Sequence, residues 1–164
     1  MPGYDGGRSD RVDSAVPSPA CAGQGFGKHR QQVLDFLRQQ DLRNTVVITG
    51  DKHQNSVRNV PESYTDIAGP AIATEFVGTS ISTEGNTPPK TTYGGVPGNA
   101  HILFENFQRG YVRVLLEPER WTSDFRVVET VSRREDVPTT TLATFVVEHG
   151  VPGATRAESV VSPV

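Results

Sequence analysis

One short segment of the sequence gathers side chains that can do chemistry, and it reads Gly50-Asp51-Lys52-His53-Gln54-Asn55. The Asp51 carboxylate and the His53 imidazole are two positions apart, a spacing that points both to one side of an extended backbone. A carboxylate and an imidazole on one side can hold one metal ion or a bridged pair. Gln54 and Asn55 add neutral oxygen and nitrogen groups for a phosphate or a metal-bound water. The pattern alone fits a metal site or an ordinary turn.

A helix and a strand are expected directly before this segment. Apolar residues between positions 33 and 37 fall on one helical face opposite polar ones, which predicts an amphipathic helix over 28–41. The β-branched run at 46–49 is typical of a strand buried on both faces, and Gly50 follows it at once. Ligands bind at strand ends in α/β sheets because the backbone there opens into a crevice. The segment therefore occupies a position suited to a ligand site.

The rest of the chain is expected to be rich in strands. Strand-like runs occupy 71–81, 101–107, 110–117, 121–131 and 141–148, with a long loop at 82–99. The runs at 101–107 and 110–117, joined by Gln108-Arg109, fit a hairpin within a meander of antiparallel strands. Arginines alternate with apolar residues in these runs, which predicts an outward sheet face carrying Arg109, Arg113, Arg120 and Arg126.

Composition limits the classes of protein and of partner. The 164 residues predict one domain, but only 35% are hydrophobic, against roughly 45–50% in a usual globular domain, so much of the chain should be loop. Sixteen basic and nineteen acidic residues give a net charge of −3 and no footprint for nucleic acid or an anionic membrane. The single cysteine, Cys21, excludes an intramolecular disulfide and a cysteine-based metal cluster. Residues 1–10 show no secretion signal.

Three blocks of sequence resemble, in the same order, the alkaline phosphatase D (PhoD-like) metallophosphatase family. The first, over 30–55, contains the helix, the strand and the Gly-Asp-x-His turn. The second is ATEFVGTSIS at 73–82, and the third extends from His101 through Arg109-Gly110-Tyr111 to Val128. The resemblance spans 28–148 and corresponds to the C-terminal third or so of a family member. The expected organisation is a glycine-rich loop or disordered arm at 1–27, the PhoD-like segment at 28–150 and a flexible tail at 151–164.

The resemblance implies a fold and an activity. The fold would be α/β, the mixed, β-rich C-terminal part of a metallophosphatase β sandwich flanked by helices. The activity would be metal-dependent hydrolysis of a phosphoric monoester or diester, with Asp51 and His53 as catalytic and metal-site residues and with iron and calcium as the metals. Two further site candidates lie in the matched blocks. Glu75 is one, against an alternative in which it faces solvent or pairs with an arginine, and His101 is the other, against a hydrogen-bonded structural role.

The resemblance also leaves functions open. Complete members carry a large N-terminal portion that supplies further ligands, and 1–27 holds only the carboxylates Asp5, Asp10 and Asp13. The chain is thus expected to be an enzyme that depends on a missing N-terminal portion or a partner chain, or a catalytically inactive fragment or interaction module that keeps the sheet. A small binding module using the 82–99 loop is a third reading. Lys52 would either repel a metal ion or reach a substrate phosphate. Family members are commonly exported, which implies the same for the parent protein.

Overall fold

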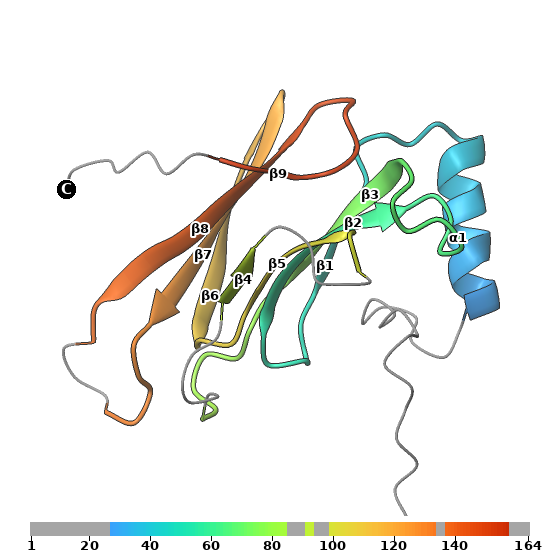
Figure 1. The fold of residues 1–164 in the computed structure, drawn as a ribbon. Coiled ribbons are helices and arrows are strands. Elements are labelled where there is room, and N and C mark those ends of the chain that lie inside the picture. Colours follow the sequence, from blue (N-terminus) through green and yellow to red (C-terminus); the bar gives the residue numbers. More distant parts are fainter. Residues whose placement is uncertain (1–26, 85–90, 94–98, 134–136, 158–164) are drawn as a thin grey trace, which may run out of the picture.

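The protein folds as a mixed, β-rich α/β structure (Figure 1). The computed structural model describes residues 27–84, 91–93, 99–133 and 137–157, and these contain one helix and nine strands. The elements are α1 Gly27–Gln39, β1 Val46–Thr49, β2 Asn55–Pro61, β3 Ala71–Val77, β4 Thr91–Tyr93, β5 Ile102–Asn106, β6 Gly110–Glu117, β7 Arg120–Val128, β8 Thr139–Glu148 and β9 Thr155–Arg156. The fold class expected from the sequence is confirmed, whereas the expected arm at 1–27 lies almost entirely outside the described residues.

Two sheets make up the sandwich. The first has the strand order β1-β3-β2-β5-β4, and the second has the order β6-β7-β8-β9. Only β1 and β3 are parallel among the described strand pairs, and their register aligns Val46 with Thr74 and Thr49 with Val77. Because the two strands run together and end together, the segments that follow Thr49 and Val77 leave the same end of the first sheet. The region between these two segments, here called the crevice, is the place where α/β sheets bind ligands.

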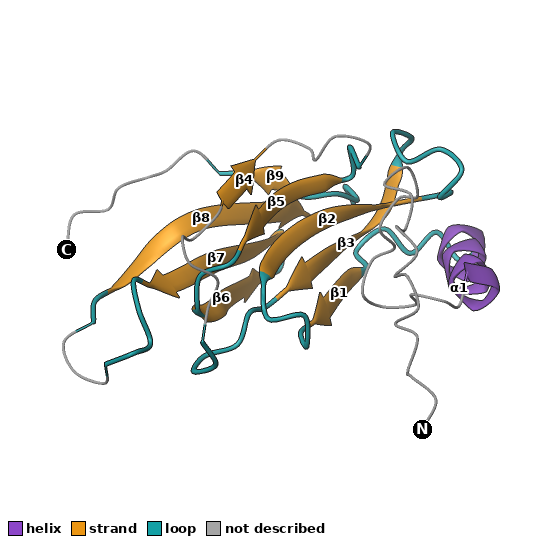
Figure 2. Ribbon diagram, turned by 60° about the horizontal axis from the view of Figure 1, so that its bottom comes forward, coloured by secondary structure: helices purple, strands orange, loops and turns teal. Residues whose placement is uncertain are grey.

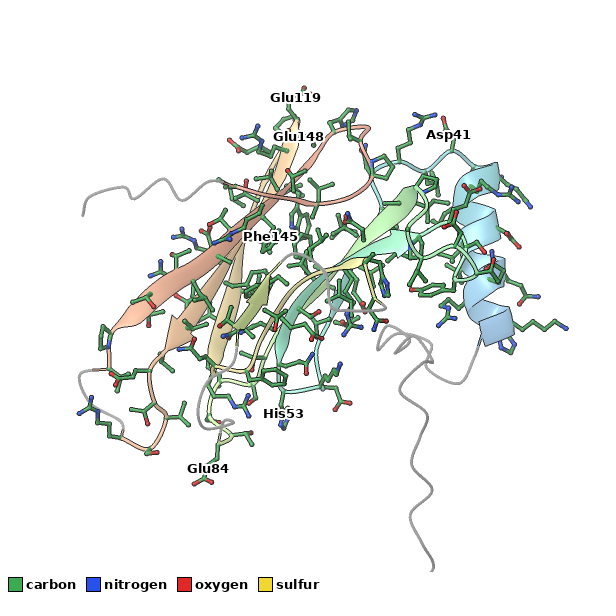
Figure 3. The ribbon with its side chains drawn as sticks, in the orientation of Figure 1. Asp41, His53, Glu84, Glu119, Phe145 and Glu148 are labelled. Atoms are coloured by element: carbon green, nitrogen blue, oxygen red, sulfur yellow. The ribbon has the colours of Figure 1, made fainter. Side chains whose placement is uncertain are left out.

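The core between the sheets is built on phenylalanine rings. Phe76 and Phe104 come from the first sheet, and Phe125 and Phe145 come from the second. Figure 3 labels Phe145. The ring centroids of Phe104 and Phe125 are 5.0 Å apart, and those of Phe104 and Phe145 are 5.6 Å apart. Burial of each ring contributes about 1.5–3 kcal/mol, so these four side chains are a main source of stability. Smaller buried residues complete this core, namely Val57, Ala143, Val147 and Ala154.

Helix α1 covers part of the opposite face of the first sheet (Figures 1 and 2). Leu34 is its one buried residue, and it packs on Val60 and Ala73. The helix ends in a hydrogen-bonded cap in which Asp41 has a φ of 50° and the Leu42 amide donates to the Leu37 carbonyl at 3.0 Å. This cap turns the chain from the helix toward β1.

The predicted hairpin is wrong. β5 and β6 belong to different sheets, and residues 107–109 carry the chain from one to the other. The run at 101–107 pairs with β2, and the run at 110–117 pairs with β7. The short connection between the two runs does not reveal this change of sheet. A hairpin within one sheet and a crossing between two packed sheets can both be made by so short a connection.

Several other element boundaries also differ from the prediction. β2 was not predicted, and the expected strand at 71–81 ends at Val77. β4 interrupts the expected loop at 82–99, and β9 pairs with β8 inside the expected tail at 151–164. β1 matched its predicted bounds but not its predicted burial on both faces, because Ile48 is 67% exposed at the edge of the first sheet.

Candidate functional site

The turn that follows β1 carries Asp51 and His53, and its backbone is not extended as predicted. Asp51 has a φ of 67° and His53 a φ of 53°, and the Lys52 amide donates to the Gly50 carbonyl at 2.8 Å. The two-residue alternation that placed both side chains on one side therefore does not apply. All three side chains from Asp51 to His53 are nonetheless exposed, so a ligand at the end of the sheet has access to them.

Two left-handed residues in so short a turn store strain. A residue other than glycine in this region costs of order 1–3 kcal/mol and persists only where its surroundings hold it. Such residues cluster at ligand-binding and catalytic positions, because the fold holds there a conformation that the isolated chain avoids. Among the described residues, the Asp51–His53 turn holds two of the three non-glycine residues with positive φ, and the third, Asp41, lies in the cap after α1. The turn lies at the opposite end of the molecule from Glu119 and Glu148 (Figure 3).

Gln54 and Asn55 are buried directly after the turn and bind neighbouring segments. The Gln54 side-chain amide donates to the Glu105 carboxylate at 3.1 Å. The Asn55 side chain accepts from the Thr79 amide at 3.2 Å and donates to the Gln108 carbonyl at 3.3 Å. Their amide groups thus join the turn to β5 and to the segment after β3.

Glu75 lies in a buried ion cluster on the first sheet. Glu75 and Arg58 are each 1% exposed, and the Arg58 Nη1 and Glu75 Oε2 atoms are 3.6 Å apart. Arg58 Nη2 also lies 3.8 Å from Glu105 Oε1, while Thr49 donates to Glu75 Oε1 at 3.2 Å. The alternative in which Glu75 pairs with an arginine is therefore observed. Because Thr49 precedes the turn and Glu105 binds Gln54 after it, this cluster connects the two strands that flank the turn.

The structure does not bring His101 to the turn. Its backbone carbonyl accepts from the Asn59 amide at 2.8 Å, well along β2 from His53, and its ring meets Tyr64 edge-on at 6.0 Å. Burial lowers the pKa of His101, and the Arg58 guanidinium lowers it further. Neither ring nitrogen has a hydrogen-bond partner among the described residues, so the expected hydrogen-bonded role is not observed either.

Arg109 is the residue of this region that the sequence analysis misplaced. It is buried, at 6% exposure, rather than on an outward face, and it donates to carbonyl groups on both sides of the crevice. Arg113 and Arg120 are exposed as predicted and pair with Asp124 and Glu148. The signal that could have separated Arg109 from them is Gly110 beside it, because glycine marks a close backbone approach.

The donor set at the turn fits part of a metal site. A carboxylate and an imidazole, both accessible, suit the metals that take oxygen and nitrogen ligands. Within the part of the chain that the structure describes, no three side chains of His, Cys, Asp or Glu lie together as a metal-binding group. Further ligands would have to come from outside the described residues. The described helix is also too short and too polar to cross a membrane.

Comparison with known proteins places the chain in a phosphatase family. The model of the PhoD-like phosphatase family matches residues 9–125, and the chain therefore belongs to this family. It is 34% identical over 137 residues to alkaline phosphatase D of Bacillus subtilis (strain 168), a match that covers 82% of this chain and 23% of that protein. The solved structure of PhoD matches with a TM-score of 0.70 and 30% identity, covering 84% of this chain and 26% of that one. The chain thus spans about a quarter of the length of these relatives.

Proposed function

We propose that this chain forms part of the active site of a metal-dependent phosphoric ester hydrolase of the alkaline phosphatase or phosphodiesterase D type. The observation that carries the proposal is the strained, exposed turn with Asp51 and His53 at the ends of parallel strands, inside the segment that matches PhoD-like phosphatases. Family membership supports the reaction class, and the geometry of the turn supports the placement of these two residues in the site.

Asp51 and His53 would hold the metal through a carboxylate oxygen and an imidazole nitrogen. A metal bound there would lower the pKa of a bound water and neutralise charge on phosphoryl oxygens. Iron and calcium are the proposed metals, on the strength of the family resemblance, and a phosphate ester is the proposed substrate. Lys52 places an exposed ammonium between these two residues, within the same turn. Asn55 and Gln54 hold the turn through their own hydrogen bonds and leave the exposed face to Asp51 and His53.

We further propose that the active protein depends on the remaining portion of the PhoD-like fold, in a longer polypeptide or in a partner chain. Apolar side chains are exposed along β1 and β6, which lie on the same side of the sandwich (Figure 2). Ile48 is 67% exposed, and Leu116 is 69% exposed. A groove of about 310 Å³ runs between these strands and reaches Thr49 and Thr79, next to the turn. Strands added along this side would cover apolar surface and could bring further metal ligands to the turn.

A catalytically inactive interaction module is the second candidate function. It is favoured by the same exposed strands, and by the fact that the described residues gather no group of three His, Cys, Asp or Glu side chains at the turn. In that case the chain would bind the same remaining portion without contributing to hydrolysis. Substitutions at the turn distinguish the two candidates. They would lower the rate of hydrolysis if the chain forms part of the active site, and they would leave that rate unchanged if the chain is an inactive module.

The test is reconstitution. The chain would be co-expressed with the part of Bacillus alkaline phosphatase D that it does not match, and the complex supplied with iron and calcium. Hydrolysis of an aryl phosphate and an aryl phosphodiester at alkaline pH and metal content by elemental analysis would be measured for the wild type, for Asp51→Asn, for His53→Ala and for the control His149→Ala. In His53→Ala we expect turnover to fall at least about 100-fold and the bound metal to fall below the stoichiometric amount. The control His149→Ala should match the wild type in both measurements. A stable complex that holds no metal and hydrolyses neither ester would support the inactive module instead.

A further inference from the structure

Arg109 lies in the corner that joins β5 to β6, and its guanidinium is surrounded by acceptors. Nη1 donates to the His53 carbonyl at 2.5 Å, Nε donates to the Thr83 carbonyl at 2.7 Å, and Nη2 donates to the Glu84 carbonyl at 2.5 Å. Nη1 also lies 3.2 Å from the Thr79 hydroxyl and 3.3 Å from the Phe107 carbonyl. The three nitrogens therefore hold two stretches of backbone that are distant in sequence, at His53 and at Thr83–Glu84.

These contacts bridge the two segments that leave the ends of the parallel strands. His53 belongs to the turn after β1, while Thr79, Thr83 and Glu84 belong to the segment after β3. Figure 3 shows His53 and Glu84 at the same end of the molecule. One buried side chain from the second half of the chain thus fastens both walls of the crevice, and it reaches the candidate turn through the backbone of His53 itself.

The charge of Arg109 explains why this fastening is strong. No carboxylate pairs with the guanidinium among the described residues, and its acceptors are carbonyl oxygens and one hydroxyl. A buried charge is tolerated only where hydrogen bonds satisfy it, and hydrogen bonds from a charged donor are about twice as strong as neutral ones. The arrangement directs that attraction onto a residue whose backbone is left-handed and strained, which needs such a restraint to persist.

We propose that Arg109 is a positioning residue that holds the Asp51–His53 turn in its strained conformation before any ligand binds. That this turn is a metal-binding and catalytic element rests on the proposed function above, whereas the restraint on its backbone stands on the geometry alone. A planar fork with separate donor nitrogens is required, because the single nitrogen of a lysine cannot reach the acceptors on both of these stretches of backbone at once.

The test compares Arg109→Lys and Arg109→Ala with the wild type, using Arg113→Ala as a matched control on the neighbouring strand. Amide hydrogen exchange would be measured by nuclear magnetic resonance on the full, metal-free chain. The Lys52 amide, bonded to Gly50, reports the turn, the Thr79 amide, bonded to Asn55, reports the opposite wall, and the Asn59 amide reports the sheet. We expect exchange at Lys52 and Thr79 to accelerate at least about tenfold in both Arg109 variants, with Asn59 and the control unchanged.

Two results would overturn the proposal. Unchanged exchange at Lys52 in Arg109→Lys would show that the turn holds itself, and equal acceleration at Asn59 would show that Arg109 merely stabilises the whole fold. If Arg109→Ala does not fold, Arg109→Lys decides, because it keeps the buried charge and most of the side-chain volume. A titration with Mn²⁺ alone separates this proposal from the proposed function. Loss of the Asp51 and His53 signals in the complex with the unmatched part of Bacillus alkaline phosphatase D reports metal binding, and its absence in that complex would contradict the metal site while leaving the exchange result valid.

Discussion

His101 is a buried imidazole whose surroundings disfavour its charged form. Its side chain is 4% exposed, and it packs against Tyr64 near the Arg58 guanidinium. Burial and the nearby positive charge both lower the pKa of His101 in the folded protein. A residue that must stay neutral to remain buried links folding to pH, because the unfolded chain binds the proton more readily.

The sign of this linkage gives the first prediction. The unfolded imidazole takes up its proton near pH 6.5, whereas the folded one does so only at lower pH. The free energy of unfolding should therefore decrease as the pH falls from about 6.5 toward the lower folded pKa, and His101→Gln should remove that part of the decrease. Urea unfolding at pH 7.5 and at pH 5.5 measures it, with His149→Gln as the control. An identical difference between the two pH values in wild type and His101→Gln would contradict the prediction.

At the residue scale, the sequence drew attention to the turn after β1 but did not predict the conformation of its backbone. Asp51 and His53 were recognisable because an acid and a histidine directly follow a β-branched run. Their left-handed conformations were not, because no local pattern marks them, and Arg109, which donates to the His53 carbonyl, lies more than fifty residues away in the sequence. Arg109 itself was misplaced because alternation along a strand is the same for an outward arginine and for one at a corner between sheets.

At the element scale, the strands with apolar patterns were predicted, and the polar strand was not. β2 is nearly all buried in the first sheet, but it contains Asn55, Arg58 and Asn59. Partners from other elements lie beside these polar groups. The carboxylates of Glu75 and Glu105 lie 3.6 and 3.8 Å from the Arg58 guanidinium, and the Asn59 side chain accepts from the Ala154 amide at 2.7 Å. No local sequence pattern predicts such a strand, because its burial is stabilised by residues distant in the sequence.

The change of sheet between β5 and β6 depends on Gly110. It has a φ of 156°, and a Cβ atom built on it would lie 1.9 Å from the Arg126 carbonyl oxygen in β7. Because the clash is with backbone, no side-chain rotation relieves it. Gly110→Ala should therefore lower the free energy of unfolding by at least about 2 kcal/mol.

Chemical denaturation followed by circular dichroism checks this prediction. Gly27→Ala is the matched control, because nothing lies within 4 Å of a Cβ atom at the start of α1. That variant should be as stable as the wild type or slightly more so, since alanine favours helix. If Gly110→Ala unfolded at the same denaturant concentration as the control, the β6–β7 contact at this corner would not be as close as the structure has it.

At the scale of the whole molecule, the sequence and the exposure of the outer strands disagree in an informative way. The run at 46–49 has the pattern of a strand buried on both faces, yet Ile48 is exposed in β1. The other edge on this side of the sandwich, β6, pairs only with β7 among the described strands and also exposes Val114, Leu115 and Leu116. Apolar side chains exposed on edge strands are what we expect if further strands of the PhoD-like fold cover this side of the sandwich, as proposed above. The low fraction of hydrophobic residues in the whole chain is therefore not a property of β1 and β6, because these two strands carry more apolar side chains than they bury.

The last prediction tests whether this side binds the remaining portion of the PhoD-like fold. Leu116 is 69% exposed, so Leu116→Lys should leave the stability of the chain within about 0.5 kcal/mol of the wild type. It should weaken binding to the unmatched part of Bacillus alkaline phosphatase D about tenfold or more, because burying a leucine is worth about 1.5–3 kcal/mol and a lysine there would be desolvated. Isothermal titration calorimetry measures the affinity, and Val33→Lys, an exposed position on α1, should bind like the wild type. Equal affinities for Leu116→Lys and Val33→Lys would place the interface elsewhere, whereas a loss confined to Leu116→Lys would locate it along β6, beside the groove that leads to the Asp51–His53 turn.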